Sequence, residues 1–238
     1  MLPRVLEPEA LDHLAPDDPV AQRSRRDLRR VNAFMGARRI LARAMARAVA
    51  DVPGRPLRLL ELGCGDGRLM LDVATHRGDR WSNARLDLLD RQPIVDESTL
   101  AAFAAAGWQA RPVVADVMDW ADVDDGKRWD VIVANLFLHH FDADALRRLL
   151  AACARRADAL VACEPRRSRF ALAASHLIFF LGANAVTRND GVLSVRAGFV
   201  DRELAAAWPQ EAASWSLDEY DDGLFTHCLV AVRRRMSS

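Results

Sequence analysis

The stretch that decides the fold is Leu59-Leu60-Glu61-Leu62-Gly63-Cys64-Gly65-Asp66-Gly67. Residues 57–62 form a short apolar run typical of a buried strand, and residues 68–75 after the glycines have helical character. Glycines at a strand-to-helix turn let the backbone approach a ligand closely, and the N-terminus of the helix favours negative groups. The stretch therefore predicts a nucleotide-like cofactor here, although such a turn can also serve only as a turn.

The alternation of strand and helix continues toward the C-terminus. Strands are expected at residues 85–90, 111–115, 129–134 and 160–163, and helices at 93–106 and 142–156. This alternation implies a parallel sheet. Two further strands, around the turn Asp221-Asp222-Gly223, predict a closing antiparallel hairpin. The expected fold class is α/β: a doubly wound, Rossmann-like, seven-stranded sheet with an antiparallel C-terminal hairpin and a helical cap.

The remaining segments are expected to form an arm and a cap. Residues 1–50 predict an irregular, proline-rich arm and then a helical cap segment that Gly36 splits in two. Residues 51–164 are the predicted cofactor-binding core. Residues 165–200 predict an inserted cap that binds the acceptor, and residues 201–238 a short helix and the hairpin that complete the core. Because both cap segments carry apolar residues beyond what a sheet requires, an apolar acceptor pocket is expected.

Composition limits the class of protein. The chain has 238 residues, of which 51% are hydrophobic and 28% charged, as in one large globular domain or one domain with a cap. Its 33 basic and 33 acidic residues cancel, so no global field favours nucleic acid or an anionic membrane. The most apolar run, residues 170–186, is interrupted by polar residues, and no membrane span is expected. The four cysteines lack CxxC spacing and no signal peptide is evident, so a cytoplasmic location is expected.

Two carboxylates sharpen the cofactor prediction. Glu61 lies on the first strand, where it can receive a cationic ammonium directly or through water, whereas it would repel a dinucleotide pyrophosphate. The dinucleotide fingerprint also needs a third glycine at a position where this chain has Arg68. Asp90 ends the second strand, where a carboxylate can accept hydrogen bonds from both ribose hydroxyls. The pattern therefore fits S-adenosylmethionine better than a nicotinamide dinucleotide.

Further cofactor contacts are expected around these two carboxylates. Asp116 follows the third strand and could accept from the adenine amino group, with the Val117 amide as a donor to the ring; alone, Asp116 could equally be a turn residue. Cys64 is expected to line the cofactor and not to act as a nucleophile, which would need electropositive neighbours. The expected cofactor-binding residues are Glu61, Gly63, Cys64, Gly65, Gly67, Asp90, Arg91, Asp116, Val117 and Asn135.

These motifs resemble a known family. Residues 61–67, Asp90, Ala115-Asp116 and the run Asn-Leu-Phe-Leu-His-His-Phe at 135–141 resemble the ordered motifs of class I S-adenosylmethionine-dependent methyltransferases, closest to the quinone-biosynthesis type (methyltransferase type 11). The resemblance covers residues 57–163. It implies S-adenosylmethionine as cofactor and S-adenosylhomocysteine as product.

A second resemblance concerns the flanking segments. Residues 30–32 with 36–39, and 164–168 with 186–191 and 193–196, are similar to methyltransferases found beside bacterial type III polyketide synthases. This resemblance implies phenolic polyketides or quinols as acceptors. O-methylation is then favoured over C-methylation.

Three histidines are candidate bases. Methyl transfer from a sulfonium depends mainly on in-line positioning, but a poor acceptor such as a phenol gains from a base. His139 or His140, after the fourth strand, could take this role, or one could pack beneath the cofactor or cap the next helix. His176, in the apolar cap helix, could face the acceptor or be a core residue. No metal is expected, because adjacent residues on an extended strand point apart and no carboxylate partner follows.

The predicted acceptor is a small aromatic molecule. The polar residues Arg188, Asp190, Ser194 and Arg196 could line its pocket or belong to a solvated loop at 187–196. Nucleic acid is not expected, because the arginine run at 23–47 has little aromatic interleaving and residues 135–138 lack the Asn-Pro-Pro-aromatic loop of nucleic-acid N-methyltransferases. The alternatives are an inactive binding protein of the same fold, an RNA methyltransferase or a nicotinamide oxidoreductase. The oligomeric state is not predicted.

Overall fold

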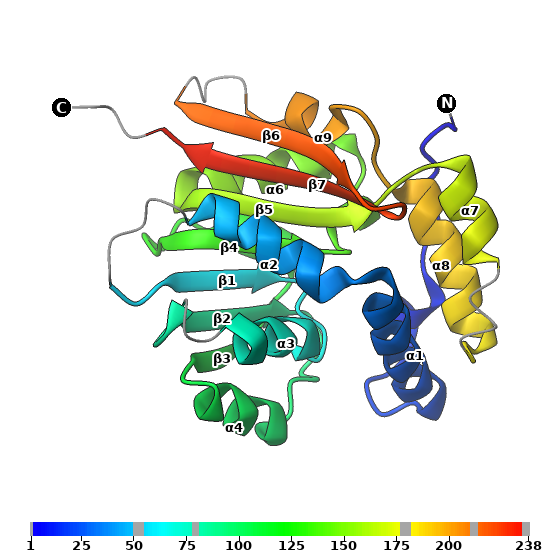
Figure 1. Cartoon of the computed structure of the whole chain (residues 1–238), viewed down its shortest axis with the longest axis horizontal. Coiled ribbons are helices and arrows are strands. Elements are labelled where there is room, and N and C mark those ends of the chain that lie inside the picture. Colours follow the sequence, from blue (N-terminus) through cyan, green and yellow to red (C-terminus); the bar gives the residue numbers. More distant parts are fainter. Residues whose placement is uncertain (1, 50–54, 78–80, 177–181, 210–213, 235–238) are drawn as a thin grey trace.

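The centre of the molecule is one seven-stranded sheet (Figure 1). The computed structural model describes residues 2–49, 55–77, 81–176, 182–209 and 214–234. The strands are β1 Arg58–Leu62, β2 Arg85–Asp90, β3 Gln109–Val114, β4 Trp129–Asn135, β5 Ala157–Pro165, β6 Trp215–Asp222 and β7 Thr226–Arg233. Their order is β3-β2-β1-β4-β5-β7-β6, with the first five parallel and β7 antiparallel to both neighbours. The predicted fold class and its closing hairpin are confirmed.

Helices cover both faces of this sheet. The helices are α1 Pro19–Met35, α2 Ala37–Ala48, α3 Arg68–Arg77, α4 Glu97–Ala105, α5 Val117–Asp122, α6 Ala143–Arg156, α7 Arg169–Ser175, α8 Ala185–Ala197 and α9 Glu203–Ala207, with short 3-10 turns η1 Ala10–His13 and η3 Leu138–His140. Side-chain caps set several of their starts. Asp142 accepts from the amides of Asp144 and Ala145 and begins α6 as predicted. Among the described residues, no helix is both long and apolar enough to cross a membrane.

Two apolar clusters flank the sheet, as the period of two along a strand requires. Leu59 joins the cluster formed with α2, α3 and α4, whereas its neighbour Leu60 joins the cluster formed with α5, α6 and α9. Both side chains are almost fully buried. The sheet is therefore the middle layer of three, and its strand ends remain free to build a site (Figure 1).

The N-terminal helices correct one expectation. Gly36 has a φ of +73° and separates α1 from α2 as predicted. Helix α1 contacts α8 at the end of the sheet, as a cap segment should (Figure 1). The expected cap of residues 1–50 is nevertheless wrong for α2, because Leu41 and Met45 are fully buried against the sheet. This helix covers β5 and β7, whose apolar face would otherwise meet water.

The inserted segment also differs from the expectation. The predicted polar loop at 187–196 is helix α8, whose start is capped by Asn184 accepting from the Thr187 amide. Its buried residues include Thr187, Asp190 and Leu193, which recur at helical spacing. Two of these three buried side chains are polar. The predicted apolar cap helix corresponds to α7, and its expected continuation over 177–181 lies outside the described residues.

Candidate functional site

A pocket of about 840 Å³ opens at the carboxyl ends of β1, β2 and β4. Strand order reverses at β1, and ligands of open α/β sheets bind at such a switch point. Residues of the N-terminal arm, residues 2–18, and of α1 line its other side. Nine of the ten expected cofactor residues line this pocket: Glu61, Gly63, Cys64, Gly65, Asp90, Arg91, Asp116, Val117 and Asn135. Their common location agrees with the sequence-based grouping.

The glycine loop after β1 has the backbone conformation that glycine favours. Gly63, Gly65 and Gly67 have φ values of +63°, +55° and +72°. A Cβ at Gly63 would lie 2.1 Å from the Phe137 ring, so the backbone and this ring are in close contact. A Cβ at Gly65 would meet nothing within 4 Å. Gly67 is the exception to the expected lining: it is buried beside Leu88 at the start of α3 and does not line the pocket.

Asp90 holds the glycine loop in place. Its Oδ2 accepts from the Gly65 amide at 2.9 Å, and its Oδ1 accepts from the Gln92 amide at 2.9 Å. Each carboxylate oxygen can accept a further hydrogen bond. The predicted contact with ribose hydroxyls therefore remains open to Asp90, which in addition orders the loop.

Glu61 is a buried carboxyl group with an unpaired atom. Its side chain on β1 is 4% exposed, and Oε2 has no hydrogen-bond partner. Burial, together with the nearby carboxylates of Asp66 and Asp90, raises the pKa of Glu61 to about 8. A cationic ligand in the pocket would restore the ionised form by supplying the missing partner.

The remaining cofactor candidates have structural partners as well. Asp116 accepts from the Met118 amide at 2.7 Å and caps α5, a helix that the sequence did not predict. Arg91 donates to the backbone carbonyl of Asp12 and so ties the arm to the end of β2. Burial raises the pKa of the Cys64 thiol far above its ordinary value, which agrees with the prediction that it is not a nucleophile.

Glu164 organises the turn that carries the two adjacent histidines. This fully buried carboxylate, on β5, accepts from the amides of Phe137, Leu138 and His139 at 3.1, 2.9 and 3.3 Å. It also bonds His139 Nδ1 at 2.8 Å. Sequence reasoning missed this role, although a glutamate at the very end of a buried strand was the available signal.

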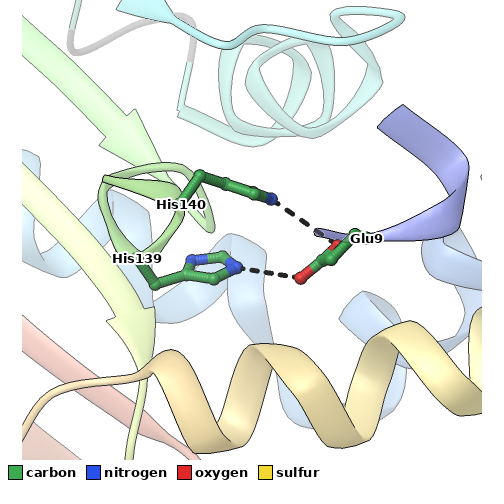
Figure 2. Close-up of side chains that lie close together, drawn as sticks. All are labelled: Glu9, His139 and His140. Carbon is green, nitrogen blue, oxygen red and sulfur yellow. Dashed lines mark hydrogen bonds and ion pairs between the residues drawn. The ribbon is translucent and has the colours of Figure 1, made fainter. Parts of the chain in front are cut away.

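Glu9, from the N-terminal arm, faces both histidines (Figure 2). His139 Nε2 lies 3.4 Å from Glu9 Oε1, and His140 Nε2 lies 3.6 Å from Glu9 Oε2. Burial disfavours a charged His139, but hydrogen bonds to Glu164 and Glu9 outweigh it and raise its pKa to about 9. The same contacts hold the pKa of Glu9 well below its ordinary value, against the effect of burial.

The structure contradicts one reason for expecting no metal here and adds a carboxylate that no local sequence pattern shows. His139 and His140 lie on the turn η3 and not on an extended strand, and their ring centroids are 4.2 Å apart. Glu9 supplies the carboxylate that the nearby sequence lacks. Together the three residues place one potential ligand atom each within 4.8 Å of one another.

His176 lies elsewhere. It is exposed at the C-terminal end of α7 and does not line the pocket, so it is found neither facing the acceptor nor in the core, the two alternatives expected from the sequence. The apolar neighbours that motivated the prediction fall largely on residues 177–181, outside the described residues.

Helix α8 holds the arm across the pocket. Asp190, 4% exposed, accepts from the amides of Ala10 and Leu11 at 3.0 Å each. Ser194 lines the pocket and donates to Glu9 Oε1, while Arg196 pairs with Glu7 at 2.9 Å. Of the polar residues expected around the acceptor, one therefore lines the pocket and two fix the arm.

Residues 60–159 match the model of a methyltransferase domain. They include the glycine loop, Asp90, Asp116 and both adjacent histidines, so the match covers most of the pocket. No curated protein matches the chain in sequence. The resemblance to quinone-biosynthesis methyltransferases and to those beside polyketide synthases stays a prediction.

Solved methyltransferase structures share the fold over nearly the whole chain. The plantazolicin methyltransferase BpumL, in complex with S-adenosylhomocysteine, is 12% identical, with 92% of each chain covered and a TM-score of 0.67. The magnesium protoporphyrin IX methyltransferase ChlM from Synechocystis PCC 6803, with bound S-adenosylmethionine, is 14% identical, covering 94% of this chain and 88% of the other, with a TM-score of 0.52. The pyocyanin biosynthetic protein PhzM is 19% identical, covering 91% and 59%, with a TM-score of 0.57. At these identities the likeness concerns the fold.

Proposed function

We propose that the protein is an S-adenosylmethionine-dependent methyltransferase that uses the pocket at the carboxyl ends of β1, β2 and β4. The observation that carries this proposal is Glu61, a buried carboxyl group whose Oε2 lacks a partner beside an open glycine loop. An unpaired buried polar group costs free energy unless a ligand satisfies it. The ammonium group of S-adenosylmethionine supplies a donor of the right charge. The methyltransferase domain and the cofactors of the solved neighbours support the same assignment.

The other pocket residues suit the rest of this cofactor. The methionine portion lies by Glu61 and the glycine loop, the ribose by Asp90, and the adenine by Asp116 and Val117. Support comes from the order of these residues along adjacent strand ends, β1, β2 and β3. S-Adenosylhomocysteine is the product, because transfer of the methyl group leaves a neutral thioether.

The proposed acceptor is a small aromatic molecule, a phenolic polyketide or a quinol, methylated on oxygen. The pocket wall opposite the cofactor residues includes the aromatic rings of Phe137 and Phe141 and the cluster of Glu9, His139 and His140. Aromatic rings favour a flat apolar acceptor, and the polar cluster favours a hydroxyl group on it. The solved neighbours are named for three different products, plantazolicin, magnesium protoporphyrin IX and pyocyanin, so the acceptor class rests on this chain's own pocket.

Positioning supplies most of the proposed rate enhancement. Holding the sulfonium methyl and the acceptor oxygen in line contributes on the order of 7 to 11 kcal/mol. Removing the proton of a phenol adds roughly 10² to 10⁴ in rate. The location of His139 and His140 on the pocket wall supports a role for this pair in ionising the acceptor.

We further propose a cytoplasmic protein that acts on a small molecule and not on nucleic acid. All four cysteines are free thiols, as expected in a reducing compartment. Arginines of the N-terminal run have acidic partners within the chain: Arg29 pairs with Asp66, Arg43 with Asp222 and Arg47 with Asp218. These pairs reduce the charge available to a phosphate backbone.

The direct test of the activity uses S-adenosylmethionine carrying an isotopically labelled methyl group. The purified chain is incubated with a panel of phenols and quinols, and labelled products are identified by mass spectrometry. Label on an aromatic oxygen is the expected result. Binding of the cofactor without turnover on any acceptor, including a cell extract, would favour an inactive binding protein of the same fold.

A further inference from the structure

We propose that Glu9, His139 and His140 bind a divalent transition-metal ion at the acceptor side of the pocket. Each residue offers one ligand atom, and the three atoms lie within 4.8 Å of one another (Figure 2). Two imidazoles and one carboxylate with an open position are the ligand set of catalytic zinc and of non-haem iron sites. The binding of the ion stands on this geometry alone; its role in catalysis rests on the proposed function.

The spacing of the ligand atoms suits coordination. Bonds of about 2.0 to 2.1 Å to a tetrahedral ion separate neighbouring ligand atoms by about 3.3 Å. The two Nε2 atoms lie 3.4 and 3.6 Å from the Glu9 carboxylate oxygens. These distances are long for a charge-assisted hydrogen bond, of which the 2.8 Å contact of His139 Nδ1 with Glu164 is an example in the same cluster. The spacing of the three ligand atoms therefore leaves room for an ion between the two Nε2 atoms and the carboxylate.

The outer nitrogens of both rings are arranged as in metal sites. His139 Nδ1 lies 2.8 Å from Glu164 Oε2, and His140 Nδ1 lies 3.0 Å from the carbonyl oxygen of Phe137. When each Nδ1 donates to such an acceptor, the lone pair of the neutral ring is on Nε2, which faces Glu9. His140 Nε2 is moreover buried without a hydrogen-bond partner. An ion would supply the missing partner.

The third ligand is held in place by other parts of the chain. Ser194 donates to Glu9 Oε1, and Asp190 fixes the next two amides of the arm, those of Ala10 and Leu11. The carboxylate of Asp12 lies 3.7 Å from His140 Nε2 and adds negative charge beside the ion.

Glu9, His139 and His140 all line the pocket, so an ion held by them would be open to an acceptor bound there. A phenolic oxygen bound there would ionise more readily, with its proton released to water. The resulting phenolate oxygen attacks the methyl carbon, the carbon–sulfur bond breaks, and its electron pair stays on sulfur. The two histidines then act as ligands of the ion in place of the bases predicted from the sequence.

Calorimetry with zinc chloride tests the site directly. The full chain is treated with a chelator, transferred to metal-free buffer and titrated with Zn²⁺, and with Mg²⁺ for comparison. One Zn²⁺ ion per chain is expected, with Mg²⁺ binding far more weakly because imidazole suits zinc. His140→Ala and Glu9→Gln should each weaken zinc binding at least about 100-fold, since even loss of an outer partner of a ligand costs about 10- to 100-fold.

Two matched variants serve as controls. Glu7→Gln removes a carboxylate from the same arm, and His76→Ala removes an exposed imidazole from α3; both should bind zinc like the parent chain. Cobalt(II) provides a second readout, because its visible absorption bands report nitrogen and oxygen ligands and should be lost in His140→Ala. Absence of zinc binding, or equal binding by the Glu9 and His140 variants and the parent, would overturn the site. S-Adenosylmethionine binding is measured on the same samples, so failure of the cofactor assignment is distinguished from failure of the metal site.

Discussion

The two walls of the pocket are built in different ways. The wall at β1 and β2 comes from one short stretch of chain, residues 58–90, in which Glu61, the glycine loop and Asp90 follow in order. The opposite wall joins segments that are far apart in sequence: Glu9 meets His139 across 130 residues and Ser194 across 185. The first wall is fixed by local strand and turn geometry, whereas the second depends on tertiary contacts of the arm, η3 and α8.

This difference separates what each wall does in the proposed function. A locally encoded wall suits the invariant part of the reaction, the cofactor, because its geometry depends mainly on contacts within one short stretch of chain. A wall made of distant segments can change its side chains without disturbing the sheet, which suits an acceptor. Mutations in the first wall should therefore affect cofactor binding, and mutations in the second should affect the acceptor with the cofactor retained.

The largest effect is expected for Gly65→Val. The φ of +55° strains any β-branched residue, and the open space that a side chain would fill belongs to the proposed cofactor site. S-Adenosylmethionine affinity should fall at least about 100-fold in calorimetry, with the circular dichroism spectrum retained.

The matched control for this variant is Gly223→Val in the turn between β6 and β7. Gly223 has a φ of +74° and also meets nothing within 4 Å, so the backbone strain is comparable. Its cofactor affinity should stay at the parent value. Equal losses of affinity in both variants would mean that strain, and not occupation of the pocket, explains the result.

Glu61→Gln should weaken cofactor binding by about 10- to 100-fold and stabilise the ligand-free protein. The lost contact with an ammonium is worth roughly 1.5 to 3 kcal/mol. The pKa of Glu61 is raised to about 8 in the folded state. The protonated group therefore contributes fully to the free energy of unfolding at low pH, and this contribution is lost as the pH rises from about 4.5 through 8. Glutamine does not titrate, so Glu61→Gln keeps its stability as the pH rises. Its Tm should therefore exceed that of the parent by a growing margin over this pH range.

Thermal unfolding between pH 4 and pH 9, with and without S-adenosylmethionine, measures both effects of Glu61→Gln. Glu7→Gln, at an exposed ion pair, is the control and should show neither. A variant that is less stable than the parent at pH 8 would contradict the account of Glu61 as an unpaired buried carboxyl group.

Asp190→Asn tests the second wall with a smaller effect. The amide offers only one acceptor oxygen for the two amides of Ala10 and Leu11, so part of the arm loses its anchor. Hydrogen exchange in residues 4–14 should accelerate about tenfold, and the acceptor KM should rise, while cofactor affinity changes less than about threefold. The control is Asp144→Asn on the exposed face of α6. Loss of cofactor binding in Asp190→Asn would contradict the claim that the second wall affects the acceptor and not the cofactor.

Arg29→Ala should have the smallest effect. Arg29 on α1 pairs with Asp66 in the glycine loop at 2.6 Å and forms an ionic link between the walls, but both side chains are partly exposed. Such pairs contribute about 0 to 1 kcal/mol. Calorimetry should give a cofactor affinity within about threefold of the parent. A larger loss would mean that the arm side orders the glycine loop.

Sequence could predict the first wall because its signals are local. The apolar run before Gly63, the carboxylate at the end of β2 and the cap at Asp142 can each be recognised from residues within a few positions of them. The second wall was not predicted, since no local pattern joins Glu9 to a turn 130 residues later. Helix α8 was missed for a related reason: its buried positions include the polar residues Thr187 and Asp190, which a hydrophobicity pattern does not register, and Asp190 binds distant amides of the arm.

Calorimetric titration of S-adenosylmethionine into the unmodified chain, with NAD as the comparison, tests the central claim most directly. The account predicts binding of one S-adenosylmethionine per chain, binding of S-adenosylhomocysteine at the same site, and no heat from NAD. Replacing Asp90 with alanine should weaken S-adenosylmethionine at least about tenfold, because it removes both the ribose acceptor and the support of the Gly65 amide. No binding of S-adenosylmethionine, or tighter binding of NAD, would contradict the account.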